Sequence, residues 1–237
     1  YAKKQTLKSL EEGLKLQNSH KQYQRLILNT RVDGVWDDHD YGINDAGKYV
    51  VDRRQRQEKY VDFLINSGSS DLEYLYKQDG LYHTRDIVVD NTSVRVIFLD
   101  TRSFRDHPYI RSLGEVDFPL SAIVAAAIRA SYSVLGFGRM FEGDVLGSEQ
   151  WRWLEEQLKE ASTPSDASPE FTIIVSSIQL LTTNPVVESW SHFPLAKKRF
   201  FDLLSKYNLA NLLFLSGDVH MGELSSAQYH RADGRSG

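Results

Sequence analysis

The chain contains 237 residues, which is enough for one sizeable domain. Hydrophobic residues make up 41% of it and charged residues 25%, a globular balance that excludes wholesale disorder. The net charge of -4 gives no reason to expect a nucleic-acid partner, which would need a basic face, and the absence of cysteine excludes disulfides, thiolate metal ligands and a cysteine nucleophile.

The first hundred residues are predicted to form two helices and three strands. Apolar residues at helical spacing indicate the helices, within 3–28 and 47–66. Short apolar runs indicate the strands, at 32–36, 82–89 and 93–99. Because only three turn-forming residues separate the last two runs, we expect these to pair as a hairpin.

The second half of the chain continues this alternation, which predicts an α/β fold. Helices are expected at 147–161 and 194–207, and strands at 171–175 and 211–215. No internal repeat and no strong domain boundary is visible, so we treat residues 1–237 as a single domain.

An apolar stretch rich in small residues, 118–137, carries a single charge at Arg129. Its length approaches the roughly 20 residues of a membrane span. A central arginine costs about 2.5–3.5 kcal/mol on insertion scales, so we favour a buried helix or a lid. A membrane-contacting helix is the alternative.

Four of the apolar runs are followed directly by polar or ionisable residues. These polar segments are 37–40, 100–102, 176–179 and 216–220. In α/β sheets, ligands bind at the carboxyl ends of the strands, where side chains from several strands reach one crevice. Two of the segments contain both aspartate and histidine, which indicates a metal-centred site.

The acidic cluster of Asp37, Asp38 and Asp40 needs a partner, because the three carboxylates would repel one another if packed together. A cation, raised pKa values or full solvation would each relieve that repulsion. Oxygen ligands favour calcium, magnesium, manganese or ferric iron, and His39 and His220 leave room for a transition metal. The alternative is a solvated acidic turn.

Two further pairs of residues have alternating spacing. If the chain stayed extended, Asp218 and His220 would lie on one face and could meet one ion or two neighbouring ions. A turn aspartate followed by a core histidine is the alternative. Arg102 could bind a phosphate through two parallel hydrogen bonds, with a structural ion pair to Asp100, or one between Arg105 and Asp106, as the alternative.

The segment 35–45, Val-Trp-Asp-Asp-His-Asp-Tyr-Gly-Ile-Asn-Asp, resembles the signature of the PhoD-like (alkaline phosphatase D) metallophosphatases. Further blocks of that family follow in its order, at 99–106, 146–155, 176–179, 188–194 and 215–220. Together they span about residues 26–224.

The resemblance implies a calcineurin-like metallophosphoesterase fold, which is a β-sandwich flanked by helices. It also implies that a metal-activated oxygen hydrolyses phosphate monoesters or diesters, with a small phosphorylated substrate. Members of the family are associated with Ca2+ and, in some, with Fe3+. They are typically exported, so we expect a secreted or secretory-pathway protein.

The resemblance also carries roles onto individual residues. It assigns metal ligands at five positions: Asp38, Asn44, Asp45, Asp218 and His220. At His39 it places the residue that stabilises the transition state or protonates the leaving group. Arg102, the phosphate-binding candidate, is the second predicted catalytic residue beside His39.

The chain departs from the superfamily pattern before Trp36. Two metal-binding motifs, each with a ligand aspartate, normally come before this block, but only 35 residues precede it here and Asp33 is their only aspartate. We therefore expect a domain truncated at both ends that carries half of a metal site. A catalytically inactive fragment that binds a cation or phosphate, or serves as an interaction module, is the alternative function.

Overall fold

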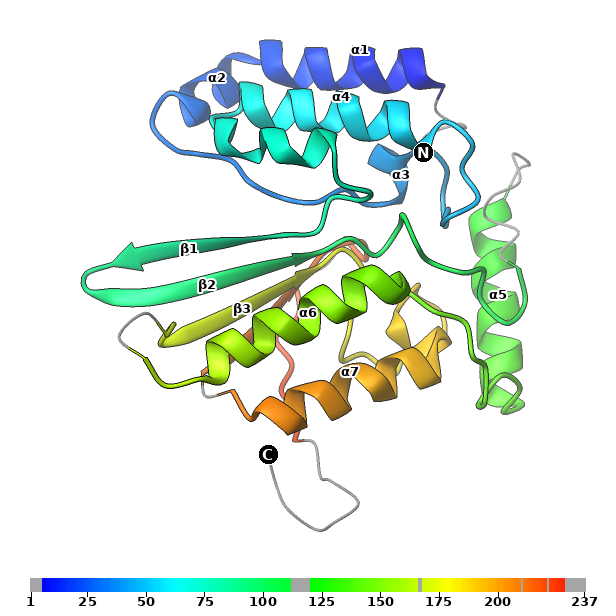
Figure 1. Ribbon diagram of the computed structural model, residues 1–237. Coiled ribbons are helices and arrows are strands. Elements are labelled where there is room, and N and C mark those ends of the chain that lie inside the picture. The colour runs from blue at the N-terminus through cyan, green and yellow to red at the C-terminus, as the bar shows by residue number, and fades with distance from the viewer. Residues whose placement is uncertain (1–5, 112–119, 166–167, 210, 221, 229–237) are drawn as a thin grey trace.

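The computed structural model describes residues 6–111, 120–165, 168–209, 211–220 and 222–228. Figure 1 shows its helices and strands. In chain order they are α1 (Leu7–Ser19), α2 (Lys21–Ile27), α3 (Asp38–Tyr41), α4 (Arg53–Asn66), the 3-10 helix η1 (Ser70–Tyr76), β1 (His83–Val89), β2 (Thr92–Leu99), α5 (Ser121–Val134), α6 (Gly147–Ser162), β3 (Phe171–Ser176), the 3-10 helix η3 (Trp190–His192), α7 (Pro194–Tyr207) and β4 (Leu212–Ser216).

The four strands form one open mixed sheet in the order β1-β2-β3-β4. The predicted hairpin is confirmed, with β1 antiparallel to β2, whereas β3 and β4 are parallel to β2. The α/β class is therefore confirmed. Within the described ranges there is one sheet, so the two sheets of the expected sandwich are not seen.

One hydrophobic core joins the sheet to α6 and α7, which lie side by side against it in Figure 1. Both helices follow their predicted ranges closely, because their apolar side chains recur on one stripe. On α6 this stripe consists of Trp151, Leu154 and Leu158, all buried. The rings of Trp190 and Phe200 pack 5.2 Å apart beneath it.

A second core lies in the helical layer on the β1 side of the molecule in Figure 1, where it is formed largely by α3, α4 and η1, with Leu14 of α1 packed against it. Trp36 is buried in it and donates a hydrogen bond of 3.0 Å from Nε1 to Oδ1 of Asp100. Asp100 directly follows β2, and it also accepts from the backbone N–H groups of Leu81, Arg102 and Ser103. This buried carboxylate therefore ties the helical layer to the end of the sheet.

Three predicted elements differ from the structure. The helix predicted within 3–28 is interrupted at His20, whose extended backbone separates α1 from α2. Residues 32–36 form no strand, because Val32 donates its N–H to Ser67 at the end of α4 instead of pairing with a strand. The helix predicted over 47–66 begins at Arg53. The backbone before it is held in a turn, where Lys48 N–H donates to Arg105 and a Cβ at Gly47 would lie 2.4 Å from the same carbonyl oxygen.

The apolar stretch 118–137 folds as α5 over its central part, while residues 118 and 119 lie outside the described residues. Ala125 and Tyr132 are buried, whereas Ile123 and Val134 are exposed. None of the helices in the described ranges combines the length and the apolar character that a membrane crossing requires. Contact of α5 with a membrane surface stays a prediction.

A buried ion network fixes β1 to the helical layer and predicts acid sensitivity. Asp33 accepts from His83 Nε2 at 2.8 Å and from Arg85 Nη2 at 2.7 Å. Burial would raise the pKa of Asp33, but His83 and Arg85 lower it to about 2 from its ordinary 3.8. Because the folded pKa lies below the unfolded one, Asp33 contributes about 2 kcal/mol above pH ~4, and this is lost as pH falls towards ~2.

Urea unfolding of wild type and Asp33→Asn between pH 5 and pH 2 tests this contribution. We expect the difference in unfolding free energy between the two proteins to shrink by about 2 kcal/mol as the pH falls through that window. A difference that stays constant with pH would show that Asp33 is not held ionised by this network.

Candidate metal centre

Three polar segments meet at one edge of the sheet, because β2, β3 and β4 are parallel and end side by side. Leu99 pairs with Ser176, and Ser176 pairs with Ser216. The segments are joined by a hydrogen bond between the hydroxyls of Thr101 and Ser177 and by another from Gly217 N–H to the Ser177 carbonyl. The expectation that these strand ends lie together is therefore confirmed.

The fourth segment arrives through the short helix α3 rather than through a strand. Asp37 caps that helix, and Asp38 lies in its first turn. Oδ2 of Asp38 accepts the backbone N–H of Asp45 at 3.0 Å, which folds the turn after α3 back onto it. Asp45 adopts the left-handed backbone region, with φ of 59°. Two predicted ligands are thus brought next to each other.

Three buried carboxylates converge at this point: Asp38, Asp45 and Glu188. Each contributes an oxygen atom, and these atoms all lie within 4.8 Å of one another. Glu188 comes from the loop between β3 and η3, and the sequence reasoning assigned it no role. Glu188 lies in one of the segments that resemble the family, 188–194, and this position is the sequence signal that could have identified it.

Two fully buried arginines hold Glu188. Arg102 donates from Nη1 and Nη2 to the two oxygens of Glu188 at 3.1 and 2.9 Å, and from Nε to Asp37 at 2.7 Å. Arg105 donates to Glu188 and to the carbonyls of Asp45 and Ala46. The two guanidiniums therefore position the Glu188 loop against the turn that carries Asp45.

The hydrogen bonds of Arg102 bear on its predicted role in binding phosphate. Its remaining donors reach Asp37 again and the carbonyl of Ala46, so all five N–H groups face acceptors within the protein. In this arrangement Arg102 holds the site together through acceptors of the protein itself, and its role in binding phosphate stays a prediction. Its ion pairs are with Asp37 and Glu188, not with Asp100, while Asp106 pairs with Lys48.

Burial and mutual charge shift the pKa values of this cluster. Burial alone would raise the pKa of Asp37, but the Arg102 guanidinium holds it below its ordinary value. Burial and the neighbouring charge of Arg102 lower the pKa of Arg105 to about 9, so Arg105 stays charged at neutral pH. Burial, with the charges of Asp37 and Asp38, raises the pKa of Asp218 to about 6. The ionised form of Asp218 is therefore less favoured than that of a free aspartate, and a bound cation would stabilise it.

The donor set fits a hard cation. Arg129 pairs with Asp45 and joins Arg102 and Arg105 in offsetting the negative charge. The described residues of the cluster nevertheless include five carboxylates against these three guanidiniums: Asp37, Asp38, Asp45, Glu188 and Asp218. Closely spaced carboxylate oxygens are the ligands that Ca2+ and similar ions bind. A cation bound by Asp38 and Asp45 would reduce the residual negative charge.

The other predicted site residues lie at different places around the cluster. β4 ends at Ser216, and Asp218 and His220 have φ of 74° and 53°, so the extended arrangement expected for these two is wrong. His220 is exposed and lies outside the carboxylate group found among the described residues. Asn44 is half-buried beside Asp45. Their roles as ligands stay predictions.

His39 lies on α3 at the rim of the cluster. Its side chain is 36% exposed, and Nε2 lies 3.9 Å from Oδ1 of Asp38. It is therefore both near a candidate ligand and open to solvent, as a group that exchanges protons with a substrate must be. The catalytic role of His39 stays a prediction.

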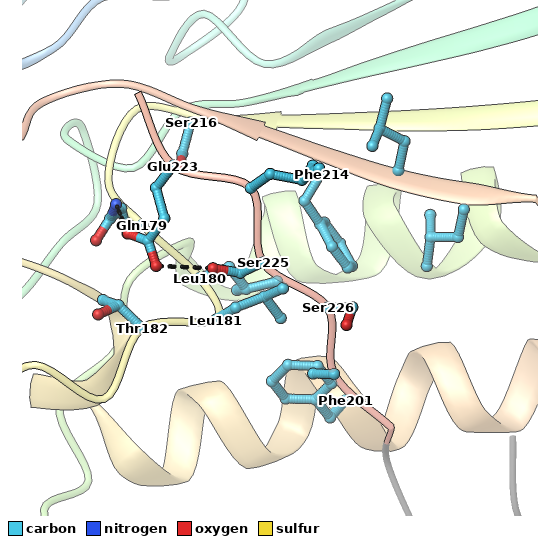
Figure 2. Close-up of a pocket in the computed structure, with 14 residues that line it drawn as sticks. Gln179, Leu180, Leu181, Thr182, Phe201, Phe214, Ser216, Glu223, Ser225 and Ser226 are labelled. Carbon is cyan, nitrogen blue, oxygen red and sulfur yellow. Dashed lines mark hydrogen bonds between the residues drawn. The ribbon is translucent and has the colours of Figure 1, made fainter. Parts of the chain in front are cut away.

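A separate cavity of about 300 Å³ lies between β4 and α7. Figure 2 shows Leu180, Phe201 and Phe214 along it, with Ser225 donating a hydrogen bond of 2.7 Å to Glu223. None of the five cluster carboxylates lines it. The cavity is therefore distinct from the candidate metal centre.

Comparison with known proteins gives one family match. The model of a family described as PhoD-like phosphatase matches residues 91–236, which is more than half of the chain. The match includes Arg102, Glu188 and Asp218, and it begins after the segment that carries Asp38 and Asp45. No curated protein and no solved structure matches the chain.

Proposed function

Because the chain belongs to the PhoD-like phosphatase family, whose membership implies phosphoesterase activity, we propose that it hydrolyses phosphate monoesters or diesters with a metal ion bound at the carboxylate cluster. The observation that carries this proposal is the convergence of buried Asp38, Asp45 and Glu188 beside the ends of the parallel strands. Ca2+ is the proposed ion, with Fe3+ as a second ion, and small phosphorylated molecules are the proposed substrates.

The residues of the cluster would divide the work of hydrolysis between them. Asp38 and Asp45 would hold the cation, with Asp218 as a further ligand. The cation supplies Lewis-acid polarisation of a phosphoryl oxygen when it is bound. As water adds to phosphorus and the ester P–O bond breaks, Nε2 of His39 would give its proton to the departing oxygen. Arg102 and Arg105 would fix the surrounding loops through Glu188.

A phosphate-release assay tests the proposal. We expect the protein to hydrolyse p-nitrophenyl phosphate or bis-p-nitrophenyl phosphate at alkaline pH with Ca2+, alone or with Fe3+. EDTA should abolish this turnover and added metal should restore it, because the proposed reaction depends on the ion that the carboxylates hold. The ratio of the two rates distinguishes a monoesterase from a diesterase. Folded, metal-loaded protein without turnover on either ester would contradict the proposal.

A binding module is the second candidate function, and one observation favours it. Arg102 and Arg105 already neutralise Glu188, and Arg129 already pairs with Asp45. The negative charge of the cluster is therefore partly compensated without a metal, as it would be in a site that binds a cation or phosphate without catalysis. Calcium binding without turnover in the same assay would support this second function over the first.

A further inference from the structure

Arg129, a charged residue of helix α5, contacts the candidate metal centre. Arg129 donates from Nη1 to Oδ2 of Asp45 at 2.9 Å and from Nε to the carbonyl of Val186 at 3.0 Å. The side chains of Arg129 and Asp45 are only 12% and 6% exposed. A guanidinium thus occupies one oxygen of a predicted metal ligand, in a place where solvent screens the contact weakly.

The same face of α5 makes a second polar contact with the body of the protein. His192 Nε2 faces the carbonyl of Val187 at 2.9 Å, so this nitrogen carries a proton and donates. Burial lowers the pKa of His192 to about 4, so its Nδ1 is free to accept from the Tyr132 hydroxyl at 2.8 Å. Arg129 and Tyr132, three positions apart, therefore attach one side of α5 to the loop that precedes η3 and to His192 at the end of η3.

The opposite side of α5 faces outwards. Ile123 is 64% exposed and Val134 is 79% exposed, and the helix lies at the edge of the molecule in Figure 1. The inner side, where Ala125 and Tyr132 are buried, therefore attaches α5 to the protein, and the polar contacts of Arg129 and Tyr132 are part of that attachment. A change in the charge at Asp45 would act directly on the contact that Asp45 makes with Arg129.

The geometry points to Arg129 as a counter-ion of Asp45 that competes with the metal ion. When no metal ion is bound, its contact with Asp45 holds α5 beside the site. This inference rests on the proposed metal centre. A cation held by Asp45 lies within a few ångströms of the guanidinium, and the two positive charges repel each other. By linkage, bound cation weakens the Arg129 contact, and loss of Arg129 strengthens cation binding by the same factor.

Calcium titration calorimetry on three variants tests this competition. Arg129→Gln removes the charge and is expected to lower the dissociation constant for Ca2+ about tenfold or more, because a full charge close to the ion is lost. Arg129→Lys keeps the charge and should stay near wild type. Arg139→Gln, an exposed arginine beyond the end of α5, is the matched control for net charge and should change binding less than about twofold.

Hydrogen exchange of residues 121–134 provides a readout independent of activity. Saturating Ca2+ should speed exchange in wild type, and Arg129→Gln should show fast exchange without calcium. Equal or weaker Ca2+ binding by Arg129→Gln would overturn the inference while leaving the metal centre intact. Folded wild type that binds no Ca2+ would overturn the metal centre and, with it, the competition.

Discussion

Replacing Glu188 with alanine is expected to lower the free energy of unfolding by about 3–5 kcal/mol, as removal of one partner from a buried ion pair does. The Glu188 carboxylate lies between Arg102 and Arg105, which are both fully buried. Without it, Arg105 loses its carboxylate partner, and only Asp37 remains to offset the like charge of Arg102 beside it. Urea unfolding followed by tryptophan fluorescence measures the loss.

Two further variants make this measurement decisive. Glu188→Gln keeps the shape and an acceptor but removes the charge, so it should lose part of the stability and should still fold if the alanine variant does not. Glu156→Ala changes an exposed glutamate of α6 and should stay within about 0.5 kcal/mol of wild type. A Glu188→Ala protein as stable as the Glu156 control would show that the arginine pair does not depend on Glu188.

Replacing His39 with alanine is expected to reduce turnover by about 10²–10⁴, the usual contribution of a positioned acid or base. The effect should be larger for phenyl phosphate than for p-nitrophenyl phosphate, because nitrophenolate is a better leaving group and needs the proton less. Since the His39 side chain is 36% exposed, stability should change little. Steady-state kinetics with both esters, alongside thermal unfolding, provides the measurement.

A histidine far from the site supplies the control for this variant. His20 is exposed between α1 and α2, and His20→Ala should leave both rates unchanged. An equal loss of rate for the two esters in His39→Ala would assign His39 to charge stabilisation rather than to proton donation. Unchanged rates would remove it from the catalytic residues.

The fold could be predicted wherever local sequence and tertiary packing agree. The turn at Asp90 and Asn91 is such a place, because both residues have positive φ, of 49° and 70°, as a tight hairpin turn requires. The run ending at Trp36 is the opposite case. Trp36 is buried and Val35 partly buried against the helical layer, and apolar character alone does not distinguish that packing from a strand.

The site could be predicted in part for the same reason. Parallel strand ends must share one edge, so Asp100 and Asp218 could be placed near it from the order of elements alone. Glu188 could not, because it lies in a loop without periodicity and its partners Arg102 and Arg105 are more than 80 positions away in the chain. Arg129 was visible as the one charge in an apolar stretch, but its contact with Asp45 depends on how α5 docks.

The central claim is that phosphoester hydrolysis depends on a cation held by the buried carboxylates, and a calcium-reactivation experiment tests it most directly. After treatment with EDTA, calcium should restore phosphate release in wild type and in Asp106→Asn, a control at a partly exposed aspartate that pairs with Lys48. The same calcium should fail to restore it in Asp38→Asn. Full reactivation of Asp38→Asn, or turnover by wild type that persists in EDTA, would contradict the account.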